Sequence, residues 1–152
     1  MSKSPKDFFR NMKDAPHVPE AGPIGEKPDP SIYSLMGDEG VINMIGEFYE
    51  RLHRSGISPM FQRDIKDSVD RSASFFVQLL GGPLYFNSKY GPPRMRMRHL
   101  PFKITESYKD EWLKCFFETL DNPKNFTFPE DHLQQFKSFL RDFSSWMVNS
   151  KD

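Results

Sequence analysis

Apolar side chains recur at steps of three and four residues along four stretches of this chain, and this spacing constrains the fold more than any other feature. The stretches are about residues 41–52, 65–80, 107–120 and 129–148, the first of them following the break Gly37-Asp38-Glu39-Gly40. Such spacing places apolar residues on one face of an α-helix, whereas a half-buried strand alternates apolar and polar residues. No segment alternates convincingly in that way. The sequence therefore predicts an all-α protein with four principal helices.

Glycine and proline mark the ends of the expected helices. Gly81-Gly82-Pro83 ends the second helix, because glycine can adopt a left-handed cap and proline cannot continue a helix. Asn122-Pro123 closes the third helix. Gly91-Pro92-Pro93 interrupts residues 84–100, which we expect to form a loop followed by one helical turn. Leu100 precedes a proline and resists helical dihedral angles, so this turn should end there.

Length and composition limit the class of protein. A chain of 152 residues suffices for one domain, and its 21 basic and 21 acidic residues cancel, so the overall charge gives no reason to expect nucleic acid as a partner. No stretch reaches the roughly 18 to 20 apolar residues of a membrane-spanning helix. The one cysteine excludes an intrachain disulfide, and no apolar leader precedes a cleavage-like site, so we expect a cytoplasmic protein.

Six prolines within residues 1–30 set this segment apart from the rest of the chain. We expect it to be a largely disordered extension, because proline and glycine at this density leave little room for regular structure. Residues 31–152 then form the folded domain.

Phenylalanine occurs 15 times in the chain, against five tyrosines and two tryptophans. Two interpretations are open: an aromatic-rich helical core, or a pocket lined for a large flat ligand. Ser68 and Ser72 raise a similar question, because they stand four residues apart where a packed helix prefers apolar groups. They either lie just off the buried face or look into a pocket.

His99 ends the basic segment Arg94-Met95-Arg96-Met97-Arg98, which apolar residues flank. A neutral imidazole is a good iron ligand, and the arginines could face the carboxylates of a porphyrin held by that iron. A lone histidine is more often an ordinary surface or core-edge residue. The segment therefore needs support from elsewhere in the chain.

Several motifs taken together give that support. They are Phe48-Tyr49, Phe75 followed by Gly81-Gly82-Pro83, the run from Arg94 to Ile104, and Asp110-Glu111-Trp112-Leu113-Lys114-Cys115. With these motifs, residues 31–152 resemble the truncated haemoglobins of group II. The resemblance implies a two-on-two helical sandwich around haem b, which is iron protoporphyrin IX, with His99 as the proximal iron ligand.

The resemblance also implies a distal side on which a ligand is held. Tyr49 matches a tyrosine whose hydroxyl donates a hydrogen bond to the bound ligand, and Trp112 matches a tryptophan whose indole N–H offers a second bond. Counting back from Gly81 places Ser68 and Ser72 on the distal helix, nearest the ligand. Ser72 is a departure, because many relatives carry an apolar residue there.

The basic run is expected to meet the haem propionates. Arg94, Arg96 and Arg98 match a family segment whose guanidinium groups can pair with these carboxylates. Three arginines on one helical turn diverge in direction, so we favour Arg96 and Arg98 over the third.

Aromatic residues complete the expected pocket. Phe61 is predicted to set its ring against the haem edge, with Met60 as its nearest rival. Phe86 stands where relatives often have a tyrosine that meets a propionate, and its neighbour Tyr85 is a candidate substitute. Two further phenylalanines are placed in the pocket: Phe75 and Phe102.

The implied function is the binding of O2, NO, CO or peroxide. Donors aimed at the ligand stabilise the negative charge it acquires, so we expect tight binding and slow release. Such retention suits redox chemistry, for example that of an NO dioxygenase or a peroxidase-like enzyme, and turnover would require an external reductase. The alternatives are a plain O2 binder, carrier or sensor, and a haem-free helical interaction module. Cys115 is assigned to packing.

Overall fold

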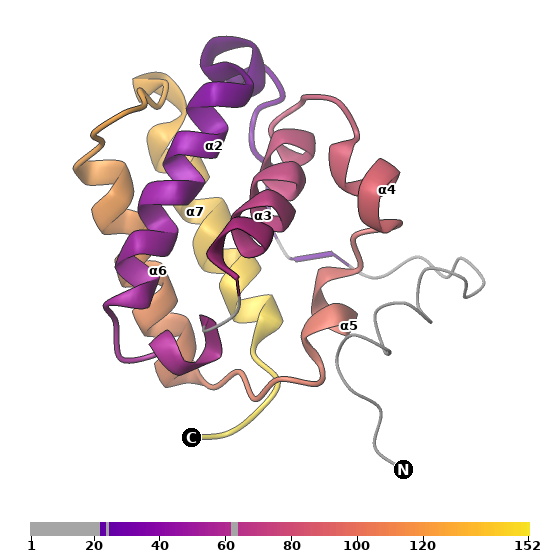
Figure 1. The fold of residues 1–152 in the computed structure, drawn as a ribbon, viewed down its shortest axis with the longest axis vertical. Coiled ribbons are helices and arrows are strands. Elements are labelled where there is room, and N and C mark those ends of the chain that lie inside the picture. Colours follow the sequence, from indigo (N-terminus) through magenta and orange to yellow (C-terminus); the bar gives the residue numbers. More distant parts are fainter. Residues whose placement is uncertain (1–21, 24, 62–63) are drawn as a thin grey trace.

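The computed structural model describes residues 22–23, 25–61 and 64–152, and within them the chain forms helices and no strand (Figure 1). The predicted all-α class is confirmed. In chain order the elements are α2 (Ile32–His53), a 3-10 helix (Ser58–Phe61), α3 (Ile65–Leu79), α4 (Tyr85–Tyr90), α5 (Met95–His99), α6 (Glu106–Asp121) and α7 (Glu130–Met147).

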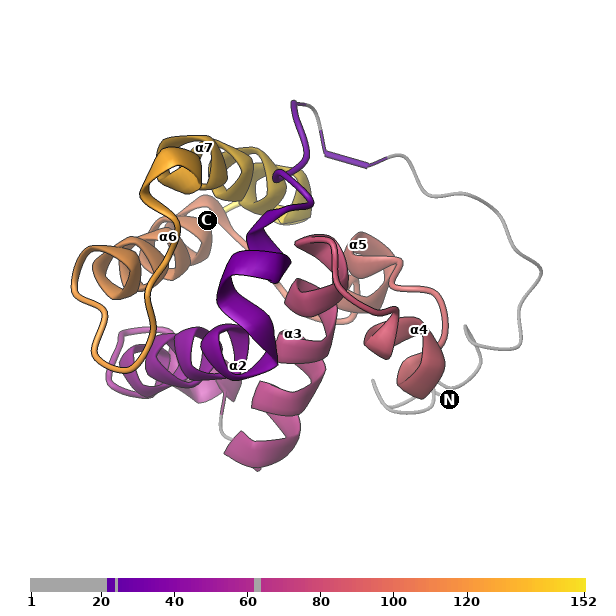
Figure 2. The same cartoon turned by 90° about the horizontal axis from the view of Figure 1, so that it is seen from above.

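The four long helices form two pairs. α2 packs against both α3 and α6, and α6 packs against α7. Seen from above, α2 and α3 lie on one side of the molecule and α6 and α7 on the other (Figure 2). This is the predicted two-on-two arrangement. None of the helices in the described ranges is long and apolar enough to cross a membrane.

Aromatic rings fill the space between the two pairs. Phe116 and Phe136 are fully buried, and their ring centroids lie 5.8 Å apart. Phe48 on α2 approaches Phe116 to 4.3 Å, and Phe76 on α3 lies 5.5 Å from the same ring. Burying a ring of this size stabilises the fold by about 1.5–3 kcal/mol. The interpretation of the phenylalanines as an aromatic core is therefore correct for these four.

The ends of α3 are set by local chemistry. The Asp64 side chain accepts a hydrogen bond from the backbone N–H of Lys66 at 2.9 Å, which caps the first turn. At the other end Gly81 adopts a φ of +102°, and the backbone N–H of Gly82 donates to the Val77 carbonyl at 2.9 Å. The predicted stop after this helix is confirmed, because glycine supplies the left-handed conformation there.

The start of α2 differs from the prediction. The helix begins at Ile32, nine residues before the predicted stretch, and it is kinked at Gly37, where φ is 69° and ψ is 176°. The predicted break is thus a kink that joins two helical segments at Gly37. The segment before the kink is tied to α3, because the backbone N–H of Tyr33 donates to the Leu80 carbonyl at 3.0 Å.

The segment between α3 and α6 also holds more helix than predicted. Residues 85–90, predicted to be loop, form α4. The turn that carries His99 is confirmed as α5 and ends at Leu100, but Leu100 itself keeps helical angles, with φ of −56° and ψ of −34°. The restriction imposed by Pro101 is therefore overcome at this position, and the turn ends without a change of conformation at Leu100.

Part of the predicted extension packs on the domain. Pro28 is buried, and the side-chain amide of Gln135 on α7 donates to the carbonyls of Glu26 and Lys27, both at 3.2 Å. The prediction of disorder for residues 1–21 lies outside the described residues.

Candidate functional site

A cavity of about 240 Å³ lies between α2, α3, α5, α6 and α7. Aromatic and aliphatic side chains form most of its wall, and a few polar groups interrupt them. Met60 and Phe61, the two rivals for one position, both line it. Nine of the twelve residues predicted for the site also line it, namely Tyr49, Phe61, Ser68, Ser72, Phe75, Arg98, His99, Phe102 and Trp112.

His99 presents a neutral imidazole to this cavity. Its Nδ1 lies 2.6 Å from the carbonyl oxygen of Met95, one turn earlier in α5. A carbonyl only accepts hydrogen bonds, so Nδ1 carries the proton and Nε2 keeps its lone pair. Burial lowers the pKa of His99, and the positive charge of Arg98 acts in the same direction, while the bond to Met95 opposes both. Neutral imidazole with an unprotonated Nε2 is the form that binds iron.

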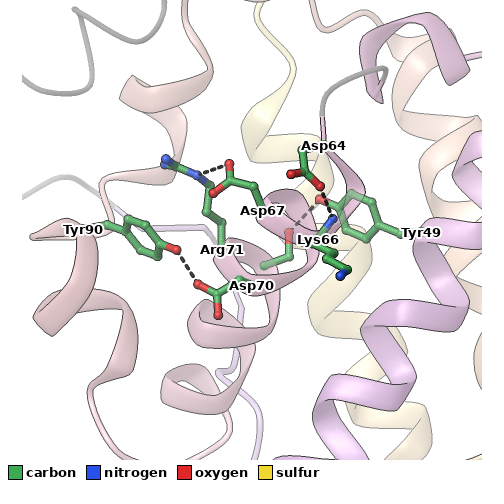
Figure 3. Close-up of polar contacts among 8 residues, drawn as sticks. Tyr49, Asp64, Lys66, Asp67, Asp70, Arg71 and Tyr90 are labelled. Atoms are coloured by element: carbon green, nitrogen blue, oxygen red, sulfur yellow. Dashed lines mark hydrogen bonds and ion pairs between the residues drawn. The ribbon is translucent and has the colours of Figure 1, made fainter.

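Tyr49 and Ser72 join two helices across the cavity. Tyr49 reaches from α2 toward α3 (Figure 3), and its hydroxyl lies 2.7 Å from Ser72 Oγ. The Tyr49 side chain is 8% exposed. Burial raises the pKa of Tyr49, while the hydrogen bond with Ser72 opposes this shift. The phenol is therefore protonated and can act as a donor inside the protein.

Trp112 adds an indole to the same wall. Its ring stands edge-on to Phe48, with centroids 5.4 Å apart and an interplanar angle of 89°. The indole N–H makes no hydrogen bond with any residue in the described ranges. Phe61 is likewise edge-on to Tyr49, at 5.8 Å and 86°. These contacts fix the rings and leave the indole N–H available to a ligand.

Arg98 is the one arginine of the basic segment Arg94-Met95-Arg96-Met97-Arg98 that lines the cavity. It is buried, its Nη2 donates to the carbonyls of Tyr90 and Pro92, both at 2.8 Å, and its guanidinium lies 5.0 Å from the Phe86 ring centroid. Burial, together with the charges of Arg71 and Arg94, lowers the pKa of Arg98 to about 10. The guanidinium therefore stays positively charged at neutral pH.

The other propionate candidates lie outside the cavity. Arg96 is exposed, and its Nε donates to the Trp146 carbonyl at 2.9 Å. Arg94 is buried at the start of α5 with a φ of 40°. Tyr85 donates to Asp38 at 3.0 Å, on the side of α3 away from His99. Of the four residues predicted to meet the propionates, Arg98 lines the cavity, and the other three, Arg94, Arg96 and Tyr85, do not.

Arg71 lines the cavity and was missed by the sequence reasoning. Its Nε donates to Asp67 Oδ2 at 3.0 Å (Figure 3), and its guanidinium lies 4.6 Å from the Tyr90 ring centroid. Arg71 stands three residues after Ser68, so helical spacing places the two on one face. That spacing is the sequence signal that could have identified Arg71. Three more polar residues of the wall were missed as well: Tyr108 and Lys109 on α6, and Ser144 on α7.

The wall as a whole fits an iron porphyrin. It combines rings that suit a large flat ligand with one imidazole that presents a lone pair. Its charged members among the described residues are Arg71, Arg98 and Lys109, with no carboxylate. Arg71 is paired with Asp67 and Lys109 with Glu106, but neither carboxylate lines the cavity, so the charge at the wall is positive and complements the two propionates of a haem. A helical sandwich with such a cavity belongs to the class of haem-binding globins.

Comparisons with known proteins agree with this class. The model of the bacterial-like globin family matches residues 31–148. The group 2 truncated haemoglobin YjbI of Bacillus subtilis is 34% identical over 91 residues, which cover 59% of this chain and 69% of that protein. Among solved structures, phosphate-bound Hell's gate globin IV superposes with a TM-score of 0.78 at 30% identity, over 90% of this chain and 89% of that one.

The X-ray structure of the truncated oxygen-avid haemoglobin from Bacillus subtilis is also similar. It has a TM-score of 0.68 at 28% identity and covers 80% of this chain and 99% of that one. The chain belongs to the bacterial-like globin family, and within it to the group II truncated haemoglobins. Membership in this family implies a haem cofactor and the binding of small gaseous ligands.

Proposed function

We propose that His99 binds the iron of haem b through Nε2, and that Tyr49, Trp112 and Ser72 hold O2 or a related small ligand on the distal side. The observation that carries the proposal is the Tyr49–Ser72 hydrogen bond of 2.7 Å in the cavity that His99 lines. When bound, haem supplies an iron with one open coordination position, where diatomic ligands bind.

The distal residues act as hydrogen-bond donors in a place sheltered from water. Tyr49 donates its hydroxyl hydrogen to the ligand while accepting a bond from Ser72. Trp112 can only donate, and its N–H has no competing partner among the described residues. Low local polarity strengthens both bonds. Ser68 lines the same wall and offers a further hydroxyl, and Phe61 holds Tyr49 in place edge-on.

The cations of the wall hold the propionates. Arg98 is fixed by two carbonyls and Arg71 by Asp67, so each guanidinium is positioned before a carboxylate arrives. We assign the propionate role to these two rather than to Arg96, whose Nε is engaged by the Trp146 carbonyl outside the cavity. Phe75 and Phe102 line the cavity and would provide apolar contacts to the porphyrin.

Two strong donors on one ligand slow its release. Tight retention is poorly suited to transport and well suited to redox chemistry on O2, NO or peroxide. The description of the Bacillus subtilis relative as oxygen-avid supports this direction. Sustained turnover requires an external reductase, and we place the activity in the reducing cytoplasm with it. A non-catalytic O2 binder or sensor is the alternative.

An absorption spectrum of the purified protein in the ferric, ferrous and oxygenated forms tests the cofactor. We expect a Soret band, and O2 dissociation from the ferrous protein that accelerates in Tyr49→Phe and in Trp112→Phe. Tyr33→Phe is the matched control, because its hydroxyl bonds Asp38 at 2.6 Å away from the cavity. Absence of a Soret band after reconstitution with haemin would favour the alternative of a haem-free helical interaction module. Fast release that neither variant alters would refute the distal network.

Steady-state NO consumption with a chemical reductant separates the enzyme from the binder. An enzyme consumes many equivalents of NO per haem, whereas a binder stops after one.

A further inference from the structure

Tyr108 lines the cavity, and its hydroxyl takes no part in the hydrogen bond between Tyr49 and Ser72. Tyr108 lies in the first turn of α6, four residues before Trp112, and both line the cavity. Residues four apart in a helix share a face. The turn itself is fixed, because the backbone N–H of Tyr108 donates to the side chain of Thr105 at 3.1 Å.

The Tyr108 ring is held by its neighbours. It stacks on Phe61 with centroids 6.2 Å apart and an interplanar angle of 23°. Phe61 in turn stands edge-on to Tyr49. One phenyl ring therefore contacts both phenols, so that Tyr49 and Tyr108 border the same part of the cavity from α2 and α6.

The hydroxyl of Tyr108 makes no hydrogen bond with any residue in the ranges that the structure describes. Burial raises the pKa of Tyr108 strongly, and the nearby Tyr49 adds to the rise. Tyr108 is half-buried in the cavity wall, and its hydroxyl lacks a protein partner in those ranges. Its hydrogen is therefore open to a partner in the cavity, whereas packing on Phe61 would be served equally well by phenylalanine.

These observations point to a ligand as the missing partner. We propose that Tyr108 is a second phenolic donor of the ligand cavity, which binds the outer atom of a small ligand with two acceptor oxygens, dioxygen or peroxide. The proposal rests on the proposed haem function. Tyr49 and Trp112 then serve the acceptor nearest the open coordination position, and Tyr108 distinguishes two-oxygen ligands from carbon monoxide, whose outer atom is a weaker acceptor.

The variant Tyr108→Phe tests this assignment in two states of the protein. In the apoprotein, the thermal midpoint should stay unchanged or rise, because no hydrogen bond is lost. In the haem-loaded protein, O2 dissociation should accelerate about 3- to 10-fold, the range of one lost hydrogen bond, while CO dissociation changes less. Tyr33→Phe is the control: it loses the bond to Asp38 and should leave both dissociation rates unchanged.

The outcomes are distinct. A normal Soret band with unchanged O2 dissociation in Tyr108→Phe overturns the role of Tyr108 and leaves the proposed function intact. A lower apoprotein midpoint with unchanged O2 dissociation also overturns it and assigns the hydroxyl to folding. No Soret band in the parent protein overturns the proposed function and this inference together. Faster O2 release with an unchanged apoprotein midpoint supports it.

Discussion

The proposed role of Tyr49 depends on its hydrogen bond with Ser72. A phenol and a serine hydroxyl each donate one hydrogen and can accept another. When Ser72 donates to Tyr49, the phenolic hydrogen stays available to a ligand and is polarised by the bond that the oxygen accepts. A serine in this place therefore supports Tyr49, whereas an apolar residue would only pack against it.

We expect Ser72→Ala to accelerate O2 dissociation less than Tyr49→Phe does. Tyr49→Phe removes the proposed bond to a partly charged ligand, which is worth about 1.5–3 kcal/mol or roughly 10- to 100-fold in rate. Ser72→Ala removes only the supporting bond. Stopped-flow release of O2 measures both, and Ser74→Ala is the control, because this buried serine of α3 lies outside the cavity. Slower release in Ser72→Ala would show instead that Ser72 competes with the ligand for the phenol.

Single residues show where sequence reasoning succeeds. His99, Tyr49 and Trp112 were found because each stands in a motif, and the structure places all three around one cavity. Arg71 and Tyr108 were missed, because a helical face shows which residues are neighbours but not which face meets a cavity. Only the packing of α6 and α3 against the other helices decides that.

At the scale of elements, the turn after α3 depends on Gly81. Gly81 has a φ of +102°, which residues other than glycine rarely adopt. A Cβ at this position would also meet the carbonyl oxygen of Pro30 at 1.9 Å. We expect Gly81→Ala to lower the free energy of unfolding by more than about 1 kcal/mol, because alanine is strained there and backbone must move. Gly46 in α2 has open space, so Gly46→Ala should raise it by about 0.5–1 kcal/mol. Urea unfolding measures both, and equal effects would contradict the argument.

The contact between α3 and α4 should depend on pH. Asp70 accepts a hydrogen bond from Tyr90 (Figure 3) and another from Lys89, and both lower the pKa of its carboxyl below the ordinary value of 3.8. A depressed pKa means that the contribution of Asp70 to stability is complete above pH 3.8 and is lost as the pH falls through the folded-state value.

We therefore expect Asp70→Asn to destabilise the protein near neutral pH and to lose this effect in acid. The free energy of unfolding of the two proteins, measured from neutral pH down to about pH 3, gives the difference. Asp110→Asn is the control, because Asp110 makes only a 3.6 Å contact with Lys109 on the exposed side of α6. A difference that stays constant down to low pH would show that the Asp70 charge is not involved.

The bounds of three of the four long helices were predicted closely. The long helices α3, α6 and α7 lie within two residues of their predicted bounds, because several turns of periodic pattern define them. α4 spans six residues, too few for a period to be visible. The early start of α2 escaped prediction because the bond between Tyr33 and Leu80, which ties it to α3, joins residues distant in sequence.

For the whole molecule, haem binding should contribute a large part of the free energy of unfolding. A ligand that binds only the folded chain stabilises it by mass action. We expect the haem-loaded protein to unfold at a higher temperature than the apoprotein, and His99→Ala to reduce that gap sharply. Calorimetry of both forms measures it. His53→Ala, at an exposed site on the end of α2, should preserve the gap. A gap that survives His99→Ala would exclude this imidazole as the anchor.

The segment before α2 also contributes to the whole fold. We expect deletion of residues 1–30 to lower the free energy of unfolding more than deletion of residues 1–21. The longer deletion removes the buried Pro28 and the two carbonyls that Gln135 binds. Each hydrogen bond contributes about 0.5–1.5 kcal/mol, within the resolution of urea unfolding. Equal stability of the two shortened chains would assign no role to residues 22–30.

The position of Trp112 in the cavity wall has an optical consequence. The chain has two tryptophans, and Trp146 lies one ring behind the wall, 6.0 Å from Phe143. A porphyrin absorbs light at the wavelengths where indoles emit, so bound haem should quench the fluorescence of both tryptophans. Tryptophan fluorescence should therefore report the uptake and loss of the cofactor without an added label.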